Sequence, residues 1–154
     1  MVQPVSFKSP IGLLCIIASE KGITHITLTK KTLPMPQKIS DDLKDSLIQL
    51  KKYFDGKSRT FSLKLSAEGT VFQKKVWAAA STIPYGKTAT YSDIAKQIGK
   101  PNAVRAVGSA LGKNPICIIV PCHRVLPKSG GIGEYALGAS VKKWLLDFEQ
   151  TLTP

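Results

Sequence analysis

Apolar and polar residues alternate along much of the first thirty positions. Residues 5–7 and 23–29 mix apolar and polar positions with a period close to two, 12–18 form an apolar run, and turn formers separate them at Ser9-Pro10 and Ser19-Glu20-Lys21-Gly22. This pattern is typical of β-strands with one buried face. It predicts an antiparallel meander of three strands.

A helical period follows this meander. Apolar residues recur three or four positions apart from 43 to 54, Ser40 stands at the N-cap position, and Gly56 ends the helix. Residues 61–65 alternate again and predict a further short strand. Because no cluster of chemically useful side chains occurs in residues 1–66, we expect this part to be a scaffold domain of α/β type.

Residues 67–154 are mostly helical by pattern and form the second predicted domain. The predicted helices cover 71–81, 91–98, 103–111 and 141–148, and Thr70, Thr90 and Asn102 stand at the N-cap positions of the first three. The second and third are joined by a short turn that contains Gly99. This is a helix-turn-helix pattern, although an ordinary corner of two helices would look the same.

A possible chemical centre follows the third of these helices. Residues 116–120 are an apolar, largely β-branched run, which predicts a buried strand, and Pro121 ends it because proline cannot donate to a β-ladder. Cys122 is then held at a rigid strand end, with the His123 imidazole beside it to help form the reactive thiolate. The alternative is a buried structural cysteine, as most free cysteines are.

Composition narrows the class of protein. The chain has 154 residues, of which 43% are hydrophobic, and its net charge of +12 favours a polyanionic partner such as nucleic acid. Its cysteines, Cys15, Cys117 and Cys122, are odd in number and form no CxxC motif, which indicates a reducing compartment. Two scattered histidines are too few for a zinc site. With no signal sequence or membrane-spanning run, we expect a soluble intracellular protein without a metal centre.

The helix predicted over 103–111 has one long polar side chain, Arg105, among small residues. Readers of the major groove usually carry several polar side chains, whereas a slim helix suits the minor groove, which is only about 6 Å wide. Arg105 is therefore a candidate wedge for base flipping, with a salt bridge or a carbonyl clamp as alternatives. Glu149, at a helix end where the dipole disfavours an acid, is expected to pair with His123.

Taken together, the motifs resemble the O6-alkylguanine-DNA alkyltransferases, also called methylated-DNA–protein-cysteine methyltransferases. The resemblance covers about 70–149, and over 1–66 it rests on the order of the elements. The motifs that carry it are Val71-Phe72-Gln73, Val76-Trp77, Ile83-Pro84-Tyr85-Gly86, Thr90-Tyr91-Ser92-Asp93-Ile94-Ala95, Arg105-Ala106-Val107-Gly108, Asn114-Pro115 and Pro121-Cys122-His123-Arg124-Val125.

The family resemblance implies an α/β (α+β) fold, in which a ribonuclease-H-like α/β domain precedes a winged-helix-like domain with a helix-turn-helix. It implies a monomeric, cofactor-free DNA-repair enzyme of the cytoplasm, where it would be associated with the nucleoid, or of the nucleus in a eukaryote. The enzyme would bind double-stranded DNA containing O6-alkylguanine in the minor groove, flip the base, and move the alkyl group irreversibly to Cys122. O4-alkylthymine is a further expected substrate.

The resemblance also implies roles for single residues. Cys122 would be the nucleophile, His123 its base through a bridging water, Glu149 the residue that orients His123, and Asn114 the residue that fixes the turn before the nucleophile. Arg105 would replace the flipped nucleotide. The remaining expected contacts with the base or the DNA are Tyr91, Ala103, Ala106, Gly108, Ser109, Arg124, Val125, Tyr135, Ala136 and Leu137.

Departures from the family pattern are few. The family often has serine where Ala136 stands, but the backbone N–H that would face O6 is retained. Leu137 replaces a glycine of some members and is expected to narrow the pocket against benzyl-sized adducts. Cys117 is expected to be a packing residue, and the zinc ligands that some members carry have no full counterpart.

Three other classes of protein compete with this interpretation. An alkyltransferase-like lesion-binding protein would carry another residue in place of Cys122. A helix-turn-helix regulator with a redox-sensing cysteine would need a polar recognition helix and a dimerisation surface. A cysteine hydrolase would need a base distant in sequence from the thiol.

Overall fold

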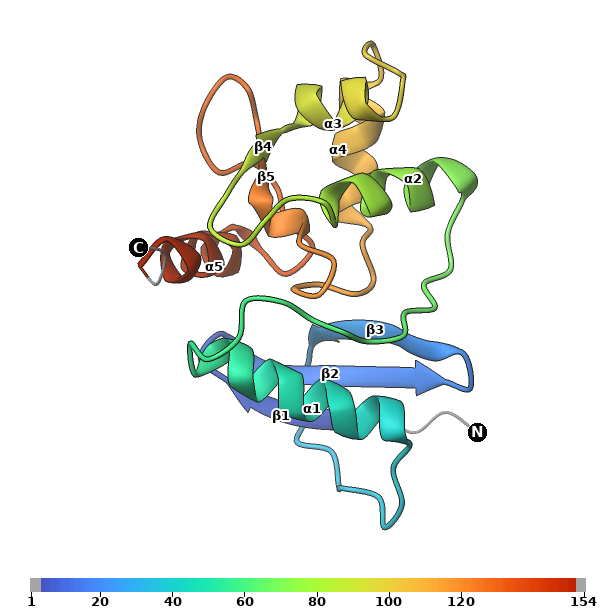
Figure 1. Cartoon of the computed structure of the whole chain (residues 1–154). Coiled ribbons are helices and arrows are strands. Elements are labelled where there is room, and N and C mark those ends of the chain that lie inside the picture. The colour runs from blue at the N-terminus through green and yellow to red at the C-terminus, as the bar shows by residue number, and fades with distance from the viewer. Residues whose placement is uncertain (1–3, 152–154) are drawn as a thin grey trace. The chain divides into compact units, whose positions relative to one another are not determined.

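The computed structural model describes residues 4–151 and divides into two compact units, with the boundary between Glu68 and Gly69. The first unit contains β1 (Val5–Ser9), β2 (Gly12–Ser19), β3 (Gly22–Leu28) and α1 (Asp41–Phe54). The strands pair antiparallel in the order β1-β2-β3, which confirms the predicted meander. Helix α1 lies across one face of this sheet (Figure 1), and the core of the unit lies between them.

Local contacts in this unit follow from the residues at its turns. Ser40 caps α1 as predicted, since its hydroxyl accepts a hydrogen bond from the Leu43 N–H at 3.2 Å. The strand predicted over 61–65 is wrong, because within this segment Leu65 alone pairs, in an isolated parallel bridge with Ile23. Gly22 makes room for this contact: a Cβ atom there would lie 2.6 Å from the Lys64 carbonyl oxygen, and its φ is +133°.

The second unit is helical, with one short parallel strand pair. Its elements are α2 (Val71–Ala80), β4 (Ala89–Thr90), α3 (Tyr91–Gln97), α4 (Val104–Gly112), the 3-10 helix η1 (Cys122–Arg124), β5 (Val125–Leu126) and α5 (Ala139–Thr151). Thr70 and Thr90 cap α2 and α3 in full capping boxes, as their positions predicted. Strand β4 pairs with β5, which ties the start of α3 to the chain leaving η1.

Helices α3 and α4 pack against each other as the predicted helix-turn-helix (Figure 1). The predicted cap of α4 is wrong: Ala103, not Asn102, is the N-cap residue, and no side chain caps this helix. The turn itself positions Ala103, whose N–H donates to the Lys100 carbonyl at 2.9 Å. Across residues 4–151, no helix is long and apolar enough to cross a membrane.

Candidate active site

A tight turn held by Asn114 precedes the candidate nucleophile. The Asn114 Nδ2 donates to the Val120 carbonyl at 3.0 Å, and its Oδ1 accepts from the Ile116 N–H at 2.9 Å. The strand predicted over 116–120 is therefore wrong. These residues form a turn in which Ile118 has a φ of +75°, because the buried Asn114 amide bonds both ends and draws them together.

Cys122 opens η1 directly after this turn. Its side chain is only 2% exposed, and its N–H donates to the Val120 carbonyl at 2.8 Å. Burial raises the pKa of the Cys122 thiol, and the nearby Cys117 sulfur raises it further. A hydrogen bond with the Asn114 side chain and the charge of Lys142 act in the opposite direction without cancelling the effect of burial. The resting group is a thiol, so its reaction requires a base.

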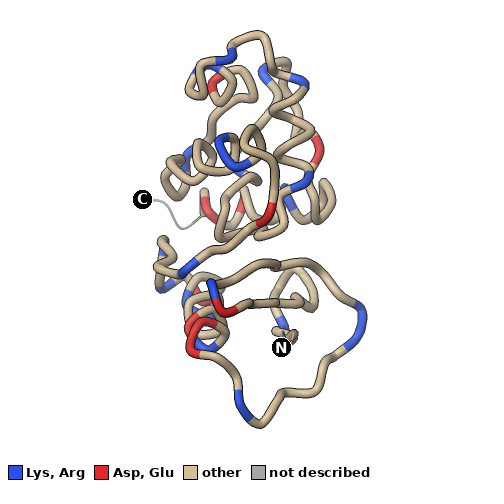
Figure 2. Tube along the Cα trace, turned by 90° about the vertical axis from the view of Figure 1, so that its right-hand side faces the viewer, with Lys and Arg blue, Asp and Glu red and all other residues tan. Residues whose placement is uncertain are grey.

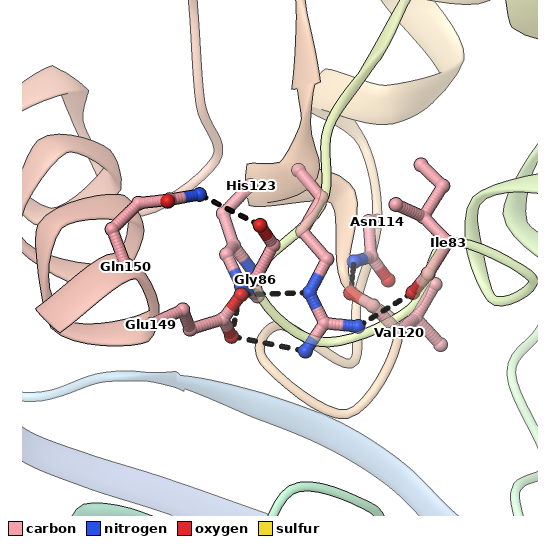
Figure 3. Close-up of polar contacts among 8 residues, drawn as sticks. Ile83, Gly86, Asn114, Val120, His123, Glu149 and Gln150 are labelled. Carbon is pink, nitrogen blue, oxygen red and sulfur yellow. Dashed lines mark hydrogen bonds and ion pairs between the residues drawn. The ribbon is translucent and has the colours of Figure 1, made fainter. Parts of the chain in front are cut away.

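His123 and Glu149 supply such a base and its orienting partner. The His123 Nε2 lies 2.8 Å from a Glu149 oxygen, and both side chains are buried (Figure 3). Because a carboxylate accepts, Nε2 carries the proton, and Nδ1 presents its lone pair. Nδ1 is buried and has no hydrogen-bond partner within the described part of the chain. It is therefore the ring nitrogen free to take a proton.

Arg124 completes the charge balance around Glu149. Its Nε and Nη2 donate to the two Glu149 oxygens at 2.8 and 3.0 Å, and its Nη1 donates to the Ile83 carbonyl at 2.7 Å. The sequence predicts that Arg124 contacts the DNA or the base. In the structure its side chain faces the protein interior. Its guanidinium is buried and bonds Glu149 and the Ile83 carbonyl in the segment after α2.

The protonation states of this cluster follow from burial and hydrogen bonding. Burial by itself would raise the pKa of Glu149, but hydrogen bonds from His123 and Arg124 outweigh it and lower the value to about 2. Burial lowers the pKa of His123, although Glu149 opposes this shift. At neutral pH the cluster therefore contains an anionic Glu149, a cationic Arg124 and a neutral His123.

Lys142 is a residue of this region that sequence reasoning missed. Its Nζ donates to the carbonyls of Val125 and Glu134 at 2.7 and 3.2 Å, and it lies 5.8 Å from the centre of the Tyr91 ring. Burial lowers the pKa of Lys142 to about 8. The missed signal was its spacing from Glu149, seven residues or two helical turns away, which puts both on the buried face of α5.

The other predicted contact residues lie on α4 and at its N-cap, at the start of α3, on β5 and in the loop before α5. On α4, Gly108 packs against the Tyr91 ring, where a Cβ atom would lie 3.5 Å from the ring. A Cβ atom on Gly133 would lie 2.7 Å from the Tyr91 hydroxyl, so the loop closes on Tyr91 as well. Exposed positions are Arg105, Ala106, Ser109 and Ala136; half-buried ones are Ala103, Gly108, Tyr91 and Leu137; and Val125 and Tyr135 are buried.

The described residues contain no group of three or more His, Cys, Asp or Glu side chains placed to hold a metal ion.

We predict that Glu149→Gln lowers the free energy of unfolding by about 3–5 kcal/mol at pH 7, because it leaves Arg124 buried without a counter-charge. The pKa of Glu149 is about 2 in the fold against an ordinary 4.5, so its charge stabilises the fold above pH 4.5 and loses this effect as the pH falls toward 2. Urea unfolding at pH 7 and pH 3 should show the difference between wild type and variant shrinking by about half.

Asp147→Asn, on the same helix, is the matched control, because the Asp147 pair with Lys143 is about two thirds exposed on both sides. It should change stability by less than about 1 kcal/mol at either pH. A Glu149→Gln protein as stable as this control would contradict the buried ion pair.

Comparison with known proteins identifies the family. Residues 5–67 match the family model of the 6-O-methylguanine DNA methyltransferase ribonuclease-like domain, and residues 71–151 match that of its DNA binding domain. These matches confirm the predicted two-part α/β fold class.

Relatives cover nearly the whole chain. A methylated-DNA–protein-cysteine methyltransferase of Methanosarcina barkeri is 46% identical over 148 residues, which cover 93% of this chain and 94% of its own. The crystal structure of Mycobacterium tuberculosis O6-methylguanine methyltransferase is 40% identical, with a TM-score of 0.89 and coverage of 100% and 96%. A structure of the M. tuberculosis protein in complex with DNA has a TM-score of 0.86, 40% identity and coverage of 98% and 94%. The chain belongs to the 6-O-methylguanine DNA methyltransferase family.

Proposed function

We propose that the protein repairs double-stranded DNA by moving the alkyl group of O6-alkylguanine, and of O4-alkylthymine, to its own Cys122. The observation that carries this proposal is the buried, neutral His123, whose Nε2 is held by Glu149 and whose Nδ1 is free to accept a proton. Relatives that bear the name methylated-DNA–protein-cysteine methyltransferase, and the M. tuberculosis structure with DNA, support the reaction and the partner.

The reaction begins with loss of the Cys122 proton. A bridging water carries it to Nδ1 of His123, and Glu149 stabilises the imidazolium that forms, as the third member of a nucleophile–base–orienter set. The thiolate then attacks the alkyl carbon, a carbon–sulfur bond forms, and the carbon–O6 bond breaks with its electrons going to the base. Protonation of the leaving guanine restores the normal base. Because the thioether product is stable, the protein acts once.

The base must leave the helix stack to reach a buried sulfur, which costs a few kcal/mol. Helix α4 presents a slim exposed face with Arg105 as its one long side chain, and this face suits the minor groove. In the proposal Arg105 fills the gap left by the flipped nucleotide. Tyr91 donates to guanine N3, the Ala136 N–H faces O6, and backbone groups of Cys122 and Val125 accept from the 2-amino group.

The charge of the chain supports the proposed partner. Residues 69–154 contain 11 basic and 4 acidic residues, and basic residues outnumber acidic ones in both units (Figure 2). Neutralising phosphates with these side chains would release counterions and make DNA binding fall as salt rises.

We also propose that the two domains of the chain have different roles. Residues 67–154 form the DNA-binding and transfer domain, and residues 1–66 form a scaffold domain, since Cys122, His123, Arg124, Lys142 and Glu149 all lie in the second unit. The protein would act in the cytoplasm, and its free cysteines fit a reducing compartment.

The direct test mixes the protein with a duplex that contains one O6-methylguanine. We expect the intact mass to rise by one methyl group, a peptide map to place that group on Cys122, and the lesion to be restored to guanine. Cys122→Ala should give no adduct, and Cys15→Ala should react as wild type does. Absence of an adduct, or transfer that persists in Cys122→Ala, would remove the proposal.

A second prediction concerns Arg105. Arg105→Ala should slow methyl transfer from the duplex by at least about tenfold, because the gap left by the flipped base is then unfilled. Transfer from the free base O6-methylguanine should stay unchanged, since no flipping is needed. Single-turnover rates on both substrates measure the effect.

Lys100→Ala provides the control, because Lys100 is an exposed lysine in the turn between α3 and α4. It should weaken duplex binding and reduce its salt slope by about 1, without a specific loss in the transfer step. If Arg105→Ala slows both substrates equally, the flipping role is wrong.

A further inference from the structure

Cys117 is a second buried thiol near the nucleophile, and the proposed alkyl transfer does not use it. Its side chain is fully buried, and its Sγ donates to the Asn114 carbonyl at 3.6 Å. Burial raises the pKa of Cys117 to about 12, against a smaller opposing effect of a hydrogen bond with Tyr135. Packing alone explains why this thiol is buried, but not why it lies beside a reactive one.

The turn after Asn114 connects the backbones of the two cysteines through Val120. The backbone of Cys117 pairs with that of Val120 in an isolated β-bridge. The Cys122 N–H donates to the Val120 carbonyl at 2.8 Å. Asn114 contacts both thiols, since its carbonyl accepts from Cys117 and its side chain hydrogen-bonds Cys122. The two sulfurs also interact electrostatically, because charge on Cys117 raises the pKa of Cys122.

We propose that Cys117 is the resolving cysteine of a reversible oxidation at Cys122, with hydrogen peroxide or another hydroperoxide as the oxidant. The inference rests on the proposed function, in that Cys122 is taken as the reactive thiol. A flipped base must be able to bring an alkyl group to this sulfur, so a molecule as small as hydrogen peroxide can reach it by the same route.

The proposed oxidation of the two cysteines takes two steps. The Cys122 thiolate attacks one peroxide oxygen, the O–O bond breaks, and the hydroxide that leaves takes up the thiol proton, which gives a sulfenic acid and one water. The Cys117 thiolate then attacks the Cys122 sulfur, and the sulfenic oxygen leaves with a proton as a second water. The two sulfurs together lose two electrons to the peroxide, and a disulfide forms.

A disulfide at this place would suspend repair without destroying the protein. Cys122 could not accept an alkyl group while bridged, but a dithiol reductant would restore it. Without Cys117, the sulfenic acid would remain open to further peroxide and pass to sulfinic acid, which thiols do not reduce. For a protein that can act only once, this protection preserves the unused acceptor.

The test treats the full-length protein with a small molar excess of hydrogen peroxide, blocks free thiols in denaturant, and maps peptides without reduction. Cys117 and Cys122 share the tryptic peptide 114–124, so their bridge appears as one unblocked peptide two hydrogen masses lighter. We expect this peptide in wild type and in Cys15→Ala. Dithiothreitol should then restore methyl transfer to wild type.

Cys117→Ala and Cys117→Ser are the matched variants. After the same peroxide treatment we expect sulfinic acid on Cys122 and a loss of methyl transfer that dithiothreitol does not reverse. If wild type gives no bridged peptide, or if it loses activity as irreversibly as both variants, the proposal is wrong.

Methyl transfer by the untreated proteins separates this proposal from the proposed function. If untreated wild type methylates Cys122 but peroxide forms no bridge, the redox inference alone fails. If the bridge forms but no methyl transfer occurs before or after reduction, the alkyl-transfer function fails.

Discussion

The buried carboxylate of Glu149 holds three segments of the second unit in one arrangement. Glu149 belongs to α5, His123 and Arg124 belong to η1, and Arg124 in turn bonds the Ile83 carbonyl in the segment after α2. Nearby, Gln150 donates to the Gly86 carbonyl at 2.7 Å and so ties α5 to the segment after α2 (Figure 3). Because a buried charge is costly unless it is fully paired, every partner of Glu149 constrains the others.

Burial in this arrangement sets the protonation state of the Cys122 thiol as well as that of the His123 imidazole. Burial disfavours both the Cys122 thiolate and the His123 imidazolium, so proton transfer between them produces two charges that the site must stabilise. Glu149 stabilises the imidazolium, and Asn114 and Lys142 lie where they favour the thiolate. The thiol therefore stays protonated until His123 takes its proton. That property suits an acceptor that is consumed by its first reaction.

Much of the fold could be predicted because local signals agreed with one another. The period of apolar residues predicted the meander, and Ser40, Thr70 and Thr90 marked helix starts, since each side chain caps the helix that follows it. Prediction failed where a long-range or side-chain contact overrides local preference. The β-branched run at 116–120 favours a strand, but the Asn114 amide bonds both of its ends and makes a turn.

The candidate site, like the fold, was predicted only in part. The adjacent Cys122 and His123, and an acid at an unfavourable helix end, predicted the thiol, the imidazole and Glu149 as one set, and the structure brings His123 and Glu149 together. The burial of Arg124 was not predicted, because its partners, Glu149 and the Ile83 carbonyl, are 25 and 41 residues away in the sequence. The spacing of Lys142 from Glu149 could have shown that Lys142 lies on the buried face of α5, but not its partners, because these are the backbone carbonyls of Val125 and Glu134.

The central claim is that Glu149 holds His123 as a neutral base with its proton on Nε2. Nitrogen NMR of the ¹⁵N-histidine-labelled protein tests this claim most directly, with the Glu149→Gln variant used to assign the His123 ring. The account predicts a neutral ring at pH 7, protonated on Nε2 and unprotonated on Nδ1, that resists protonation below the ordinary pKa of 6.5. An imidazolium at pH 7, or a neutral ring with its proton on Nδ1, would contradict it.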